Sequence, residues 1–264
     1  MSVHSPHLLH GREGNGMHKN SYQLRLAGMT YSCAFREADT ARYFGVFCRP
    51  QPSEQPQRGM EILAAEEREM DELAARRPAG RSRACLEYEV LTGKASAQLL
   101  RHGACIVHGA AFVWRGKAYL FTAPSGTGKT TQFLLWNRLF SDEIAVINGD
   151  KPIIRCHADG TVRVHPSPWM GKEQMGSLRT APLGGIIYLQ QAKENAIRRL
   201  PAQEAAVPVY TQLLYPAEST QQLRAAAALE EQMLRAAPVW LLRNKGDAAS
   251  AALTHDTILQ EEGG

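Results

Sequence analysis

A short glycine-rich stretch carries the clearest chemical pattern in the sequence. Residues 123–130 read Ala-Pro-Ser-Gly-Thr-Gly-Lys-Thr, which differs from the phosphate-binding pattern G-x-x-x-x-G-K-[ST] only in its first residue. Gly126 and Gly128 allow the backbone to curl, so that successive N–H groups point at phosphate oxygens. Lys129 can reach β- and γ-phosphates, and Thr130 can offer its hydroxyl to Mg²⁺. The pattern therefore predicts a nucleotide-binding P-loop.

The residues expected to contact the nucleotide are this loop and the residue that follows it. They are Ala123, Pro124, Ser125, Gly126, Thr127, Gly128, Lys129, Thr130 and Thr131. A strand-like stretch precedes the loop and a helix-like stretch follows it, so the positive end of a helix dipole would also face the phosphates. The competing interpretation, a glycine-rich turn without a ligand, does not explain why strand, loop, Lys-Thr and helix occur in this order.

A P-loop that holds a metal needs an acidic partner, and Asp150 is the best candidate. It follows the apolar stretch 145–148, about twenty positions after Lys129. Its carboxylate could hold Mg²⁺ together with Thr130, or accept a proton from an attacking hydroxyl. The sequence Asn-Gly-Asp-Lys-Pro at 148–152 is also favourable turn chemistry, so an ordinary turn residue is the alternative.

Two further groups of polar residues are candidates for the site. His108 lies in the strand-like stretch before the loop, where it is either a catalytic group or a histidine of the core. Lys172, Glu173 and Arg179 follow a second expected hairpin. They form either an acceptor loop or lid that brings charge to a transferring phosphoryl group, or an ordinary surface loop. The residue types alone favour neither interpretation.

The elements that must position these residues form an α/β pattern. Residues 104–113 and 118–122 are strand-like on either side of the turn Arg115-Gly116, so a hairpin is expected to lead into the loop. Further strands are expected at 145–148, 153–154, 162–164, 184–189 and 239–242, and helices at 203–214, 219–235 and 247–259.

The first hundred residues form a separate, small α+β pattern. Strand-like alternation on both sides of Gly28 predicts a hairpin, and helices are expected at 61–76 and 86–100. Residues 1–20 have no periodicity and are expected to be a disordered tail. The chain is therefore divided into this tail, an α+β region at 21–100 and a P-loop domain at 101–264.

Composition and charge exclude several classes of protein. The 264 residues are 44% hydrophobic, which is enough for a sizeable core. No apolar run approaches about 18 residues and the N-terminus lacks signal-peptide features, so neither a membrane partner nor export is expected. Five dispersed cysteines without Cys-x-x-Cys argue against a disulfide framework and favour the cytoplasm. A net charge of +4 is too small to indicate nucleic acid as a partner. The sequence is compatible with a homo-oligomer.

These motifs resemble the HPr kinase/phosphorylase family over roughly residues 99–259. The similarity rests on Val-His-Gly at 107–109, on Ser125 to Thr131, on the hairpin before the loop, on Asp150 and on the segment 182–187. The family shares its P-loop fold with the ATP-type phosphoenolpyruvate carboxykinases. The resemblance implies an α/β P-loop kinase core with a mixed sheet, in which a hairpin leads into the P-loop.

The resemblance also implies an activity. Members of the HPr kinase/phosphorylase family are ATP-dependent kinases that use Mg²⁺ and phosphorylate a hydroxyl. The resemblance therefore implies that the acceptor here is a serine of a protein or peptide, or a small molecule. A histidine matching His108 lies at the family's active site, and an acidic pair supplies the general base and a magnesium contact. Here the pair is Gly149-Asp150, so one carboxylate is missing. A nucleotide-binding module with reduced or lost turnover and a carboxykinase-type phosphotransferase are the alternatives.

Overall fold

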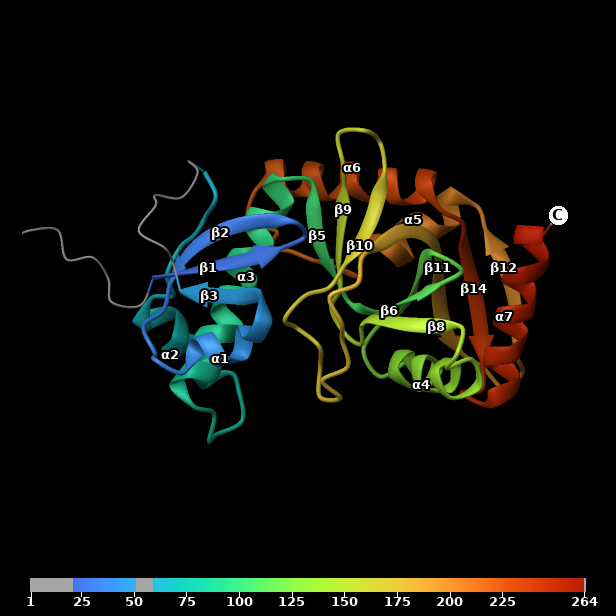
Figure 1. Cartoon of the computed structure of the whole chain (residues 1–264), viewed down its shortest axis with the longest axis horizontal. Coiled ribbons are helices and arrows are strands. Elements are labelled where there is room, and N and C mark those ends of the chain that lie inside the picture. Colours follow the sequence, from blue (N-terminus) through green and yellow to red (C-terminus); the bar gives the residue numbers. More distant parts are fainter. Residues whose placement is uncertain (1–20, 51–58, 264) are drawn as a thin grey trace, which may run out of the picture.

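The protein contains two neighbouring β-sheets with helices around them (Figure 1). The computed structural model describes residues 21–50 and 59–263, and the tail expected at 1–20 lies outside this range. A four-stranded sheet belongs to the N-terminal part, and a ten-stranded mixed sheet belongs to the rest. The expected mixed α/β architecture is therefore confirmed.

The small sheet is built on the hairpin predicted around Gly28. Its strands follow the order β3-β1-β2-β4. They are β1 (Ser21–Leu26), β2 (Met29–Ala34), β3 (Cys48–Pro50) and β4 (Glu61–Ile62), and the helices beside them are α1 (Thr40–Phe44), α2 (Glu67–Ala75) and α3 (Arg83–Arg101). The helix expected at 61–76 begins later, because Glu61 and Ile62 pair with β2 and the capping box of Glu66 and Glu69 starts the helix.

The large sheet contains parallel and antiparallel strands, in the order β13-β5-β9-β10-β11-β7-β6-β8, and β11 also pairs with β14, which pairs with β12. Its strands are β5 (Ala104–Val107), β6 (Gly109–Trp114), β7 (Lys117–Thr122), β8 (Ile144–Asn148), β9 (Ile153–Cys156), β10 (Val162–His165), β11 (Ala181–Gln191), β12 (Ala196–Leu200), β13 (Leu213–Leu214) and β14 (Val239–Asn244). The expected hairpin is β6–β7, and β7 leads directly into the P-loop.

Helices cover both faces of the large sheet. They are α4 (Lys129–Leu139), α5 (Ala202–Tyr210), α6 (Thr220–Ala236) and α7 (Ala248–Gly263). In Figure 1, α6 runs along one face, while α4 and α7 lie on the other, where they contact each other. No helix in the described ranges is long and apolar enough to cross a membrane.

Two sequence expectations need correction near His108. The strand expected at 104–113 is two strands, because the chain leaves the β9 ladder at His108 and joins the β7 ladder at Gly109. The helix expected at 203–214 ends at Tyr210, and Leu213 then pairs with Val107 as part of β13. Both corrections arise from pairing with strands distant in the sequence.

An aromatic cluster fixes α4 on the hairpin that precedes the P-loop. Phe112 and Phe121 of the hairpin and Phe133 and Trp136 of α4 are completely buried in one cluster. The ring centroids of Phe112 and Trp136 are 4.9 Å apart, and those of Trp114 and Trp136 are 5.7 Å apart. Both ends of the P-loop are therefore attached to one rigid core.

A second cluster crosses the predicted boundary at residue 100. It joins Leu24 and Tyr31 of the small sheet and Leu99 of α3 to Ile106 of β5 and Ile153 of β9. All five side chains are completely buried. The small sheet is consequently packed against the large one through a shared core.

Replacement of Trp136 tests the aromatic cluster. Trp136→Ala removes the largest side chain that α4 buries and is expected to lower the free energy of unfolding by about 3–5 kcal/mol. Leu134→Ala is the matched control on the same helix, because Leu134 is 45% exposed, and a change within about 0.5 kcal/mol is expected. Urea denaturation measures both values, and equal losses would contradict the packing.

Candidate functional site

The predicted P-loop, residues 123–130, has the backbone conformation that its glycines predict. Gly126 and Gly128 have φ angles of +79° and +106°, in the left-handed region that favours glycine, and Gly128 is the N-cap residue of α4. Ala123, which stands where the pattern has its first glycine, does not have a positive φ. Its side chain is buried in the aromatic cluster. An alanine is therefore accommodated here without backbone strain.

Lys129 is folded back onto its own loop. Its Nζ donates hydrogen bonds to the carbonyl oxygens of Ala123 at 2.8 Å and Pro124 at 3.0 Å. Burial lowers the pKa of this ammonium, and Asp150 acts in the opposite direction. The loop thus holds a buried cation whose present partners are neutral carbonyl groups.

A cavity of about 610 Å³ adjoins the P-loop. The residues 124–127 form one side, and the end of β11, residues 188–191, forms another, with Arg198 and Glu204 nearby. The side-chain amide of Gln191 donates a hydrogen bond of 3.2 Å to the carbonyl of Gly126, which fixes β11 to the loop. This volume lies in the range of small-molecule and cofactor sites.

Asp150 is held in place by the buried amide of Asn148. The Asn148 Oδ1 atom accepts hydrogen bonds from the backbone N–H groups of Asp150 at 2.9 Å and Lys151 at 2.7 Å. Its Nδ2 donates to the carbonyl and hydroxyl oxygens of Ser167, at 3.1 Å and 3.0 Å. The turn chemistry of 148–152 is therefore present, and it orients the carboxylate instead of excluding a role for it.

The structure brings three of the sequence candidates together. The Asp150 carboxylate lies 3.9 Å from His108 Nε2 and interacts electrostatically with Lys129. A further residue, Lys151, forms an ion pair with Asp150. Lys151 is not among the residues predicted from the sequence, although its position beside Asp150 was the available signal. Gln212, whose side chain forms a hydrogen bond with His108, was not predicted either.

The His108 imidazole is adapted to stay neutral. Burial lowers its pKa most, and the positive charge of Lys129 lowers it further. Asp150 and the hydrogen bond between the His108 ring and the Gln212 side chain raise the pKa and so oppose this shift. The lowered pKa favours the neutral form of the ring, which retains a free electron pair.

The segment 166–177 covers Asp150 and also contacts the neighbouring Gly149. The Gly149 N–H donates to the Met175 carbonyl at 2.9 Å, and a Cβ atom at Gly149 would lie 3.3 Å from that same oxygen. A Cβ atom at Gly171 would lie 2.9 Å from the Cβ of Asp150. A side chain at position 149 would therefore meet the backbone of Met175.

The residues of the expected acceptor loop do not reach this cluster. Lys172, Glu173 and Arg179 are exposed, and no hydrogen bond or ion pair within the described ranges joins them to Asp150 or to the P-loop. Trp169 of the same segment is buried, with its ring edge-on to Phe44 at 6.5 Å between centroids. The tryptophan is thus a packing residue, whereas the role of Lys172, Glu173 and Arg179 in an acceptor loop or lid stays a prediction.

The oxygen donors at the site fit Mg²⁺. The Thr130 hydroxyl, at the start of α4, and the Asp150 carboxylate are hard oxygen ligands, the type that Mg²⁺ prefers. No cluster of three or more His, Cys, Asp or Glu side chains that could hold a metal occurs in the described part of the chain. This donor set matches an ion held by one or two protein oxygens and by phosphates.

Comparison with known proteins gives distant structural similarity only. No protein-family model matches the chain, and no curated protein matches it. Among solved structures, the chain is similar to the Hpr(Ser) kinase/phosphatase from Coxiella burnetii, with 12% identity and a TM-score of 0.27, over 49% of this chain and 91% of that one. Values this low establish no family membership, so the functional argument rests on the site itself.

The charges around His108 can be tested by titration. In Lys129→Ala, loss of the neighbouring cation is expected to raise the pKa of His108 toward 6.5, whereas Asp150→Asn is expected to lower it further. Lys94→Ala is the control, because Lys94 of α3 pairs with Glu69 of α2, away from His108. Histidine ring NMR signals followed against pH measure the three shifts. A lower His108 pKa in Lys129→Ala would contradict the geometry.

The contact between Gly171 and Asp150 can be separated from backbone strain. Gly171 and Gly116 have similar φ angles, +74° and +77°, but a Cβ atom at Gly116 has no neighbour within 4 Å. Alanine at either position carries the cost of a positive φ, about 1–2 kcal/mol. Gly171→Ala is expected to lower the free energy of unfolding by about 1–3 kcal/mol more, because it also displaces Asp150. Equal losses in urea denaturation would contradict the contact.

Proposed function

We propose that this chain is an ATP-dependent phosphotransferase of the HPr-kinase-like type, which transfers the γ-phosphoryl group to a hydroxyl of a peptide, protein or small molecule. The observation that carries the proposal is the meeting of the P-loop lysine, Lys129, with Asp150 and His108 at one site. A P-loop alone supports nucleotide binding. A carboxylate and a neutral imidazole beside its lysine add groups that can accept a proton from an attacking hydroxyl.

Nucleotide binding is assigned to the P-loop. Its backbone N–H groups and the N-terminus of α4 would contact the phosphates. The Lys129 ammonium would exchange the carbonyls of Ala123 and Pro124 for β- and γ-phosphate oxygens, a gain because those oxygens are charged. The cavity between the loop and the end of β11 has room for the rest of the nucleotide.

Transfer is assigned to the cluster around Asp150. The hydroxyl oxygen forms a bond to the γ-phosphorus while the bond between that phosphorus and the β–γ bridging oxygen breaks, and ADP is the leaving group. The hydroxyl proton passes to Asp150. Lys129 and Lys151 would stabilise the negative charge on the phosphoryl oxygens. Thr130 and Asp150 would hold Mg²⁺, which when bound neutralises phosphate charge.

A second candidate is a nucleotide-binding module without turnover. The observation that favours it is Gly149 itself, which supplies no carboxylate and where a Cβ atom would lie 3.3 Å from the Met175 carbonyl oxygen. The two candidates share the P-loop and differ in whether Asp150 accepts a proton.

Mutants of the two central residues test the proposal. Lys129→Ala is expected to weaken Mg-ATP binding at least about tenfold in calorimetry, a loss of about 1.4 kcal/mol. Asp150→Asn is expected to retain ATP binding while acceptor-dependent ADP release falls by about 10²–10⁴-fold, measured with serine-containing peptides, small carrier proteins and free serine. Asp142→Asn is the matched control, because Asp142 is exposed and precedes β8.

The outcomes separate the candidates. ATP binding without ADP release by the wild-type protein would support the module. An active wild-type protein that is indifferent to Asp150→Asn would overturn the assignment of the base. Unchanged ATP affinity in folded Lys129→Ala would overturn the P-loop assignment itself.

A further inference from the structure

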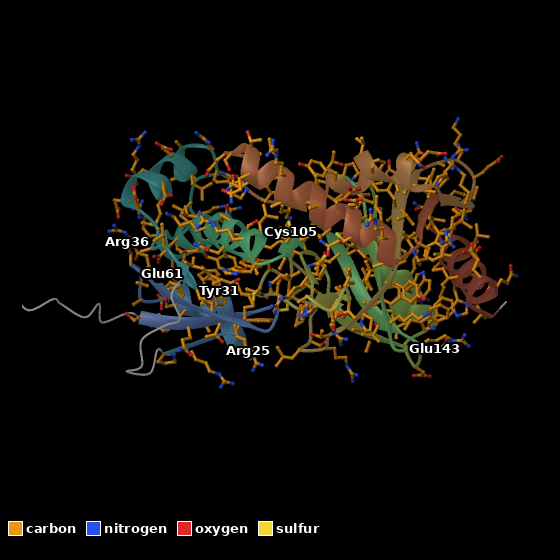
Figure 2. All side chains as sticks on the ribbon, turned by 90° about the horizontal axis from the view of Figure 1, so that it is seen from above. Arg25, Tyr31, Arg36, Glu61, Cys105 and Glu143 are labelled. Atoms are coloured by element: carbon orange, nitrogen blue, oxygen red, sulfur yellow. The ribbon has the colours of Figure 1, made fainter. Side chains whose placement is uncertain are left out.

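A second cavity, of about 590 Å³, lies in the corner between the two sheets. The outer face of the small sheet supplies Arg25 and Arg49, which are both exposed. The end of β10 supplies His165, and the chain just before β11 supplies Leu178 and Thr180. Figure 2 shows Arg25 on the side of the small sheet opposite to α3, so this corner does not belong to the shared hydrophobic core.

The corner carries unbalanced positive charge. No acidic side chain is among the described residues that line it, and no ion pair in residues 21–50 and 59–263 involves Arg25 or Arg49. Arg155 and Arg163 stand opposite each other on the neighbouring strands β9 and β10. These two arginines therefore add to the positive charge behind the cavity wall.

His165 reports the same positive field. Its ring is 7% exposed, its Nδ1 lies 3.3 Å from the Thr180 hydroxyl, and its Nε2 has no hydrogen-bond partner in the described part of the chain. Burial lowers its pKa most, and His157, Arg155 and Arg163 lower it further, to about 4. The cavity wall thus contains a buried polar group surrounded by cations.

Apolar side chains border the charged corner. Val46 is 67% exposed and Leu178 is 68% exposed, and both line the cavity. Large apolar side chains beside arginines that lack acidic partners form a surface for a ligand with both carboxylates and apolar groups. A small inorganic anion would use the arginines alone and would leave Val46 and Leu178 in water.

The corner is connected to the candidate catalytic cluster. The segment that begins after His165 and returns at Leu178 has both ends at the cavity, while Gly171 in its middle packs on Asp150. Ser177 fixes the returning part through a hydrogen bond of 3.1 Å from its N–H to the carbonyl of Ile147 in β8. A polypeptide seated in the corner would therefore lie beside the segment that covers Asp150.

We propose that this corner docks an acidic segment of a partner polypeptide, with carboxylates on Arg25 and Arg49 and apolar side chains against Val46 and Leu178. The docking role is additional to the proposed phosphoryl transfer and does not require it. Charge complementarity selects the acidic partner, and the exposed apolar border selects a polypeptide over a simple anion.

Fluorescence anisotropy with a labelled peptide of three Asp-Leu-Glu-Ser repeats tests the docking. Arg25→Glu and Arg49→Glu are each expected to weaken binding at least about fivefold, because each reverses a charge in the cavity. Arg224→Glu is the matched control, since Arg224 is exposed on α6 and makes the same change of net charge elsewhere. Binding to Arg224→Glu is expected to equal that of the wild-type protein. Thermal denaturation confirms that each variant is folded.

Further arms exclude other ligands and separate the two proposals. A matched peptide with Lys in place of Asp and Glu is expected not to bind. Leu178→Ser is expected to weaken binding of the leucine peptide but not of a version with Ser for Leu. The docking proposal would be overturned if the acidic peptide did not bind, or if Arg25→Glu and Arg224→Glu weakened its binding equally. It would also be overturned if inorganic phosphate or a single-stranded oligonucleotide bound as tightly as the peptide. Lys129→Ala is expected to bind the peptide normally, so failure of the P-loop assignment stays distinguishable.

Discussion

The buried amide of Asn148 is the interaction on which the candidate site depends. One side chain satisfies the N–H groups of Asp150 and Lys151 and also binds Ser167. The Ser167 hydroxyl in turn accepts from the N–H of Trp169 at 3.2 Å. Each of these groups would cost about 1–3 kcal/mol if buried without a partner. Asn148 therefore fixes both the catalytic candidate at the end of β8 and the segment that covers it.

The site has a second support in the attachment of the P-loop. The loop is anchored at one end by β7 and at the other by α4, and the aromatic cluster joins these two elements. The amide of Gln132 extends this support, because it donates to Asn244 of β14 at 3.3 Å. The contacts of β7, α4 and Gln132 therefore hold the loop and its two left-handed glycines in one conformation.

The local parts of this arrangement could be predicted from the sequence, and the non-local parts could not. The hairpin and the P-loop follow from alternation, from the turn at Arg115-Gly116 and from the two glycines of the loop. The split of 104–113 at His108 and the strand at 213–214 depend on pairing partners far along the chain. From the sequence, Gly149 was interpreted as a missing carboxylate. In the structure, a Cβ atom at this position would contact the Met175 carbonyl oxygen. Lys151 was missed because Asn-Gly-Asp-Lys-Pro resembles an ordinary turn.

The two lysines of the site connect phosphate binding to the state of Asp150. Lys129 donates to carbonyls of its own loop, while Lys151 is paired with Asp150. Under the proposed function, both ammonium groups are attracted to the arriving phosphates, which carry more negative charge than either present partner. Occupation of the P-loop would thereby exchange the carbonyl partners of Lys129 and the carboxylate partner of Lys151 for phosphate oxygens. The Asp150 carboxylate, still oriented by Asn148, would then be free to face the Mg²⁺ and the attacking hydroxyl of the proposed reaction.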